Sequence, residues 1–391
     1  MLSCARPPRR WVLNVGRSEF EVSGRGLDGV LEKIPRGVGS TARAWSLMRE
    51  GGPRLLSSRM TSPCVSVAIH ASLFPDAVHA RLRASFQTRR IHGAFHYDTA
   101  RRARRWMEVH AAHSPAVTAQ DSRSIYDQAA RESVVGLAAG PWGCIGLGCG
   151  SGHKEARVVA ALVVRASSVT YLPLDVSVPL VLISREEALV QSPGLTVHPI
   201  AADLTDVDDL SAAIDPLLPS GARRFLTLFG MLPNFEPEFI FERMASWLRP
   251  GDRILFSANL APGPDLETGV RTVLPQYNNP ETKAWLRTLL EDHGVPAEAG
   301  SVEFHIERDL GFPGCARIAA DWVVSRSSEW VLEGETFCLE PGERVRLFFS
   351  IRHTPSSIEF GLRSQGLRLA QSWIAGSGEE GVFLVERSNK A

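Results

Sequence analysis

The run "CIGLGCGSGHKEARVVAAL", residues 144–162, joins a short apolar stretch to a cluster of glycines and then to a helical pattern. The apolar stretch predicts a strand over 143–148, and the apolar spacing after the glycines predicts a helix over 152–166. Glycine has no Cβ, so Gly146, Gly148, Gly150 and Gly152 allow positive φ and a close approach of backbone to a ligand. Tight strand-to-helix turns also use glycine for packing alone.

Strands and helices alternate on both sides of this run. After residue 166 we expect strands over 168–175, 195–203, 223–230 and 252–260 and helices over 177–191, 206–218 and 237–248. Before it we expect three helices, over 75–87, 98–113 and 122–139. Alternation of this kind predicts an α/β fold, a Rossmann-like and mostly parallel seven-strand sheet covered by helices.

The alternation stops over 263–343, which we interpret as an inserted substrate-binding subdomain. It resumes over 344–391, where we expect the strands at 343–352 and 380–386 to pair, with a helix over 355–366 between them. Residues 60–262 plus 344–391 would then form the Rossmann-like domain. Residues 1–59 are rich in Arg, Gly and Ser, and are interpreted as a disordered extension, a transit peptide or the product of an upstream start.

Composition narrows the function classes. The chain has 391 residues, with 43 basic and 43 acidic side chains, and this balance disfavours a nucleic-acid partner. No apolar run approaches the roughly 18 residues of a membrane span. The six cysteines form no C-x-x-C pair, so we expect no metal and a reducing, cytoplasmic location.

Two acidic residues follow the strands that come after the glycine run. Asp175 ends the strand over 168–175, where an acid can accept hydrogen bonds from ribose hydroxyls, and Asp203 ends the next strand, within reach of an adenine. Each aspartate alone could serve as a helix N-cap. Together with the glycines they predict an adenosine-containing ligand.

The glycine spacing is G-x-G-x-G-x-G, unlike the dinucleotide fingerprint, and the G-K-[S/T] of a P-loop is absent. "GLGCGSG" followed by "PLDVS" resembles the first two motifs of class I methyltransferases that use S-adenosyl-L-methionine. The segments "FLTLFGMLPNFEP", "LRPGDRILFSANLAPGPD" and "GERVRLFFSIR" resemble a narrower family, the histidine-specific Nα-methyltransferases of ergothioneine biosynthesis. The similarity covers most of residues 90–391, and it implies that the chain is a divergent member of that family.

The resemblance implies a site for S-adenosyl-L-methionine, with S-adenosyl-L-homocysteine as product. Gly148, Gly150 and Lys154 would lie along the methionine part and backbone of the cofactor, and Gly146 would also belong to the cofactor site. Asp175 would hold the ribose, and Asp203 with Leu204 would frame the adenine.

For the substrate, the resemblance implies Asn234 on the α-amino and carboxylate groups, Tyr277 on the carboxylate and Ser350 on the side chain. Asn234 beside Pro233 could equally shape a turn, and Tyr277 could be a loop residue. Phe348 stands where the family has an acid that grips the imidazole, and "PAVTAQD" around Thr118 replaces a tyrosine-rich run. A buried imidazole N–H facing Phe348 would lose about 1–3 kcal/mol.

We therefore expect an N-methyltransferase acting on a small amino acid or amine other than histidine. Phe348 would offer an apolar wall to an aromatic or aliphatic side chain, or stack on a cation. We can name no catalytic base, and the oligomeric state is open. The alternatives are an O- or C-methyltransferase of a natural-product pathway and a non-catalytic relative that binds the cofactor.

Overall fold

The computed structural model describes residues 64–332 and 334–387. The chain divides into two units, Met1–Val67 and Ala68–Ala391, and the elements below belong to the second. The interpretation of residues 1–59 falls outside the described residues.

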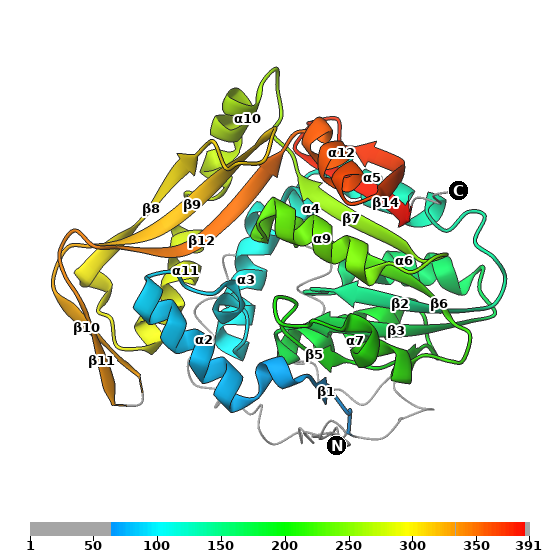
Figure 1. Cartoon of the computed structure of the whole chain (residues 1–391), viewed down its shortest axis with the longest axis horizontal. Helices are drawn as coiled ribbons and strands as arrows, with labels where there is room; N and C mark the ends of the chain where they lie inside the picture. The colour runs from blue at the N-terminus through cyan, green and yellow to red at the C-terminus, as the bar shows by residue number, and fades with distance from the viewer. Residues whose placement is uncertain (1–63, 333, 388–391) are drawn as a thin grey trace, which may run out of the picture. The chain divides into compact units, whose positions relative to one another are not determined.

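The central sheet has seven parallel strands and two antiparallel ones. Its order is β1-β5-β3-β2-β6-β7-β14-β13, with β4 beside β3, which makes nine strands among the described residues (Figure 1). The bounds are β1 Ala68–Ile69, β2 Pro141–Leu147, β3 Ser168–Asp175, β4 Thr196–Val197, β5 Ile200–Ala201, β6 Arg223–Leu228, β7 Arg253–Asn259, β13 Leu367–Ile374 and β14 Glu380–Arg387. Only β14 and β13 run antiparallel to their neighbours, so the predicted α/β class with a mostly parallel sheet is confirmed.

Helices cover both faces of this sheet. One buried cluster joins the strands to α8, α9 and α12, and another joins them to α5, α6 and α7 (Figure 1). The bounds are α5 Gln120–Glu132, α6 His153–Val163, α7 Val178–Gln191, α8 Leu210–Ile214, α9 Pro237–Trp247 and α12 Pro355–Ser364. Strands such as β2, whose residues Trp142–Leu147 are all buried, read as continuous apolar runs because both faces are covered.

A second sheet has the order β12-β9-β8 and is antiparallel throughout. Its strands are β8 Gly300–Glu307, β9 Cys315–Val324 and β12 Arg344–His353. The expected pairing of the strand at 343–352 with the last strand is wrong: β12 pairs with β9, and β14 pairs with β13, a strand that we did not predict. Since Ala68–Ala391 is one compact unit, the division at 262/263 and 343/344 stays a prediction.

The N-terminal helices pack against the second sheet. A cluster of large apolar side chains joins α2, α3 and α11 to β9 and β12, with Trp285, Trp322 and Trp330 at its centre. The bounds are α2 Pro75–Thr88, α3 Ala100–His113, α10 Leu266–Val273 and α11 Pro280–Asp292, with β10 Ser328–Leu332 and β11 Glu335–Leu339 as a hairpin. The predicted helices over 75–87 and 98–113 therefore pack against the second sheet.

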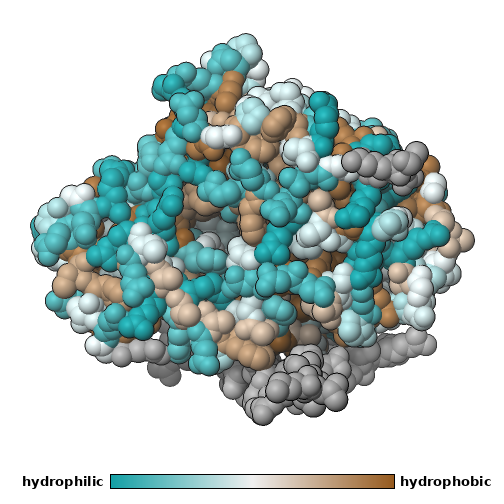
Figure 2. All heavy atoms as spheres, viewed as in Figure 1, coloured by the Kyte–Doolittle hydropathy of each residue, from teal (hydrophilic) through white to brown (hydrophobic). Residues whose placement is uncertain are grey.

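Short elements complete the chain. They are α4 Pro115–Thr118 and the 3₁₀ turns η3 Ala71–Leu73, η4 Gly93–His96, η5 Asp215–Leu217, η6 Leu232–Asn234, η7 Leu274–Gln276 and η8 Ala297–Ala299. Hydrophilic side chains predominate on the face drawn in Figure 2. None of the helices in the described part of the chain is both long and apolar enough to cross a bilayer.

Candidate active site

The glycine run forms the turn between β2 and α6. Gly148, Gly150 and Gly152 have φ of +66°, +51° and +77°, which side chains with a Cβ rarely adopt. A Cβ on Gly148 would lie 2.4 Å from the Met231 side chain, and one on Gly150 would lie 2.8 Å from the Trp106 ring. A Cβ on Gly152 would lie 2.6 Å from Cα of Ser184, so this glycine lets α6 approach α7. All three glycines are therefore closely packed, Gly148 against Met231, Gly150 against Trp106 and Gly152 against α7.

Gly146 lies earlier, inside β2, and serves packing. A Cβ there would come within 3.2 Å of Cγ of Glu155 and 3.1 Å of the Tyr171 hydroxyl. Glu155 is itself buried, and burial raises its pKa to about 8. The structure thus places Gly146 beneath the turn, next to a buried carboxyl group whose pKa is raised by burial.

Asp175 lies at the carboxyl end of β3 and is directed at the turn. One carboxylate oxygen accepts a hydrogen bond from the backbone N–H of Gly150 at 3.0 Å, and the other accepts one from Ser177 N–H at 3.0 Å. Burial raises the pKa of Asp175 to about 6, against the effect of these N–H donors. Each oxygen keeps a second lone pair, so the carboxylate can still accept from ribose hydroxyls.

Asp203 follows β5, and its carboxylate has more side-chain partners than that of Asp175. Arg81 of α2 donates to its Oδ2 at 2.6 Å, and Thr205 donates to Oδ1 through both its backbone N–H and its hydroxyl. His92 Nδ1 lies 3.7 Å from Oδ2. Leu204 is buried in the core cluster beside it. The acid predicted to face adenine is therefore already paired with an arginine that the sequence did not single out.

Lys154 and Asn234 both lie next to Gly230. Nζ of Lys154 lies 4.7 Å from the centre of the Tyr126 ring and 3.8 Å from where a Cβ on Gly230 would stand. The Asn234 side-chain amide donates to the carbonyl oxygen of the same Gly230 at 3.4 Å. Because β2 and β6 are parallel neighbours, their carboxyl ends bring the glycine turn and the η6 turn side by side. Asn234 thus shapes a turn, and that turn borders the glycine run.

Three predicted substrate residues come together on β12 and the η7–α11 loop. The Tyr277 hydroxyl lies 2.9 Å from Ser350 Oγ, and the rings of Tyr277 and Phe348 are 6.3 Å apart. Ser350 is buried, while Phe348 and Tyr277 are partly exposed. Tyr277 is therefore not a free loop residue. Asn234 approaches the group through η6, which packs against β12.

Aromatic rings connect this group to the glycine turn. Phe348 lies 5.8 Å from Trp285, Trp285 lies 5.5 Å from Tyr97, and Tyr97 lies 5.7 Å from Trp106, whose ring faces Gly150. The sequence analysis missed Tyr97, Trp106 and Trp285, although a tryptophan on the charged helix over 98–113 was a visible irregularity. The pKa of Tyr97 is raised, chiefly by burial and further by the negative charge of Asp175.

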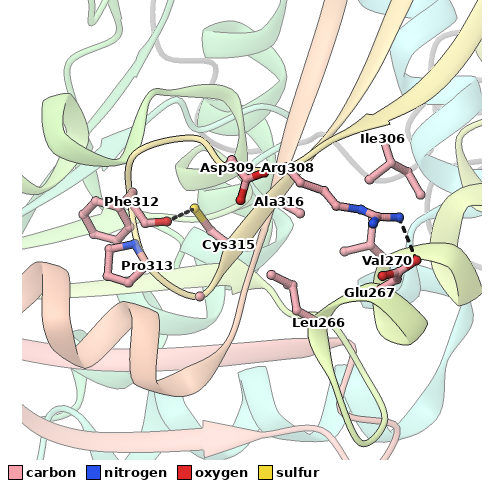
Figure 3. A pocket seen from close by; sticks show the side chains of 11 residues that line it. Leu266, Glu267, Val270, Ile306, Arg308, Asp309, Phe312, Pro313, Cys315 and Ala316 are labelled. Carbon is pink, nitrogen blue, oxygen red and sulfur yellow. Dashed lines mark hydrogen bonds and ion pairs between the residues drawn. The ribbon is translucent and has the colours of Figure 1, made fainter.

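Thr118 makes a local hydrogen bond, and a cavity beside α10 is lined by other residues. The Thr118 hydroxyl donates to the Ser114 carbonyl oxygen within α4, at 3.0 Å. A cavity of about 310 Å³ lies between α10 and the β8–β9 connection, with Leu266, Val270, Phe312 and Ala316 among its walls (Figure 3). None of the predicted site residues lines that cavity.

The residues present fit an adenosine-type cofactor, because the positive-φ glycine turn after β2 is hydrogen-bonded to Asp175, whose carboxylate keeps lone pairs for ribose hydroxyls. With the family match, fold and site define the class: an S-adenosylmethionine-dependent methyltransferase. A family model described as "Histidine-specific methyltransferase, SAM-dependent" matches residues 118–387, and the chain belongs to this family.

Solved structures resemble the chain only distantly. Magnesium protoporphyrin IX methyltransferase from Synechocystis PCC 6803 is 15% identical, with a TM-score of 0.37 over 75% of this chain and 96% of that one. The 1,6-didemethyltoxoflavin-N1-methyltransferase from Burkholderia thailandensis is 13% identical, with a TM-score of 0.36 over 83% and 96%. Among curated proteins, none is a significant match to the chain.

Proposed function

We propose that this methyltransferase transfers a methyl group to the nitrogen of a small amino acid or amine, and that histidine is not its preferred substrate. The observation that carries the proposal is Phe348. It lies beside Ser350 and Tyr277, where the family resemblance places an acid for the imidazole, and its neighbour Trp285 is also apolar. A substrate with an aromatic or aliphatic side chain suits this wall.

In this proposal the glycine turn, Lys154 and Asp175 hold the cofactor, with Asp203 and Leu204 near the adenine. Asp175 is the stronger candidate of the two acids, since neutral N–H groups hold it, whereas Arg81 already neutralises Asp203. S-adenosylmethionine supplies an activated methyl group when bound. The chain must then exclude water and align a neutral amine lone pair, which contributes several kcal/mol. Asn234 is the residue that we expect to orient the amine.

The reaction breaks the sulfur–methyl bond and forms a nitrogen–methyl bond, and the amine loses one proton to solvent or to a base that we do not assign. The test is a mass-spectrometric screen of amino acids and amines with the cofactor, reading one, two or three added CH₂ units and locating them by fragmentation. Methylation on nitrogen supports the proposal. Methylation on oxygen or carbon alone would replace it with the alternative reaction class.

A further inference from the structure

The two halves of the predicted substrate site lie on different sheets. Asn234 belongs to η6, which follows β6 of the central sheet, whereas Phe348 and Ser350 belong to β12 of the second sheet. A substrate that contacts both halves is aligned for reaction only if the spacing between them is fixed. Arg317 of β9 makes contacts that reach toward both halves.

Arg317 holds the turn of Asn234 through Glu236. Its Nη2 donates to both carboxylate oxygens of Glu236, at 2.6 Å each, and such charge-assisted hydrogen bonds are the strong ones. Glu236 immediately precedes α9, and Phe235, the single residue between it and Asn234, is buried in the core. Since two residues of chain have little reach, any movement of Glu236 is passed on to Asn234.

The same guanidinium packs behind the apolar wall of β12. It lies 4.9 Å from the centre of the Phe349 ring. Phe349 stands between Phe348 and Ser350 in the strand, and successive side chains of a strand point to opposite faces. Arg317 and Phe349 therefore lie on the face of the second sheet that is turned away from Phe348 and Ser350. One side chain thus contacts the strand that carries the wall and also holds the turn that carries Asn234.

Arg317 is itself fixed on the second sheet. Its side chain is 10% exposed, and its Nη1 donates to Glu307 of β8 at 2.7 Å. Arg346 of β12 donates to the same Glu307, and it also donates to Asp321 of β9 at 2.6 Å. Alternating charges across three strands therefore orient Arg317, whereas the side chain of Glu236 is 51% exposed. The ion pair joins a well-held cation on the sheet to a carboxylate on a surface turn, so it is the turn that the pair positions.

We infer that Arg317 is a positioning residue for methyl transfer, which acts through Glu236 and sets the span between Asn234 and the wall at Phe348. By fixing this span it favours substrates whose amine and side chain are separated by the matching length. The inference rests on the proposed function, in which Asn234 orients the amine and Phe348 faces the side chain. It adds the residue that couples these two parts of the site.

The first test follows the turn without any substrate. Amide hydrogen exchange over residues 231–236, read by mass spectrometry, should be about tenfold faster in Arg317→Met and in Glu236→Ala, because the turn loses its tie to β9. Methionine keeps an apolar chain over Phe349. The double variant should exchange no faster than either single variant, since both remove the same pair. Glu238→Ala, on an exposed acid in the first turn of α9, is the matched control and should leave the exchange unchanged.

The second test measures methyl transfer to L-leucine, L-phenylalanine and L-tryptophan, whose side chains differ in length and breadth. In Arg317→Met, kcat for the best of the three should fall roughly ten- to a hundredfold while KM changes little, because alignment matters more in the transition state than in the ground state. The preference among the three should also narrow. Arg317→Lys keeps the charge without the planar fork, so it should recover part of kcat. The stoichiometry of S-adenosylhomocysteine binding, measured by calorimetry, should stay at the wild-type value, whereas a merely structural role would lower it.

Unchanged exchange over residues 231–236 in Arg317→Met would overturn the inference, and so would faster exchange that leaves kcat and the substrate preference of the wild type in place. Faster exchange and a lower kcat, with the methyl groups found on a carboxylate oxygen or a ring carbon, would keep the inference and sink the proposed function. If none of the three amino acids accepts a methyl group, the proposed preference for these side chains falls, and the inference then stands or falls with the exchange result.

Discussion

Asp175 and Gly150 are joined by a hydrogen bond in which the backbone N–H of Gly150 donates to the Asp175 carboxylate at 3.0 Å, across 25 residues of sequence. The bond couples the end of β3 to the turn after β2. A ribose-binding acid and the glycine cradle are thereby fixed relative to each other before any ligand arrives, which lowers the ordering cost of binding.

Replacing Asp175 should weaken cofactor binding more than replacing Asn234. Loss of a buried, charge-assisted acceptor costs about 1.5–3 kcal/mol, or roughly ten- to a hundredfold in affinity. Calorimetry with S-adenosylhomocysteine on Asp175→Ala and Asn234→Ala measures this, and Asn234→Ala serves as the control. Unchanged affinity in Asp175→Ala would mean that the cofactor lies elsewhere.

Cofactor affinity should fall at acid pH. The pKa of Asp175 is raised to about 6 by burial, and ribose hydroxyls favour the ionised form, so binding requires the proton to leave. Below pH about 6 the affinity should therefore drop, approaching tenfold for each pH unit, and above it the affinity should level off. Calorimetry between about pH 5 and about pH 7, roughly one unit on either side of that pKa, tests this. Asp175→Asn should flatten the profile, and a flat profile in the wild type would contradict it.

Gly150→Ala should damage both stability and cofactor binding. Its φ of +51° is strained for alanine, and the new Cβ would press on Trp106 at 2.8 Å. Gly136, with φ of +72° and nothing within 4 Å of an added Cβ, is the matched control. Both variants should lose about 1–2 kcal/mol in denaturant unfolding, and only Gly150→Ala should also lose affinity for S-adenosylhomocysteine.

Arg81→Met should destabilise the fold. Arg81 pairs with the buried Asp203 at 2.6 Å, and its removal leaves that carboxylate without its cation, at a cost of roughly 3 kcal/mol. Arg83→Met, which breaks an exposed pair with Glu335, should cost about 1 kcal/mol or less. Equal losses of unfolding free energy for the two variants would show that the buried Arg81 pair contributes no more to stability than the exposed Arg83 pair.

Phe348→Glu should raise histidine turnover, because it restores an acceptor for an imidazole N–H worth about 1–3 kcal/mol, or roughly ten- to a hundredfold. Phe348→Leu, which keeps the site apolar, should not. Steady-state rates with histidine distinguish the two variants. A gain in both would point to relief of crowding rather than to a new hydrogen bond.

The sequence predicted the parts of the fold that depend on local pattern, namely the alternation of strands and helices and the glycine turn. Where local chemistry interrupted the pattern, the bounds moved. The expected strand over 195–203 became β4 and β5 because Pro199 has no N–H to donate, and the helix expected over 206–218 is short. The strand β13 escaped notice because a bulge between Leu369 and Gln371 breaks its alternation.

Partners distant in sequence could not be predicted in this way. The strand pattern of 343–352 was visible, but nothing local states that it pairs with β9. The ion pair of Arg81 with Asp203 and the approach of Trp106 to Gly150 likewise arise only when α2 and α3 pack in three dimensions. Tyr277 and Ser350 were found from resemblance alone, and Arg352, which donates a hydrogen bond to the Tyr277 hydroxyl, was not found.

The most direct test of the account is turnover by the wild-type chain with S-adenosylmethionine and a panel of amino acids and amines that includes histidine. Product mass and fragmentation are read together with S-adenosylhomocysteine release. The account predicts methyl groups on nitrogen, one S-adenosylhomocysteine for each, and a substrate with an apolar or aromatic side chain that is methylated faster than histidine. Histidine as the fastest substrate, or methylation confined to hydroxyl groups, would contradict it.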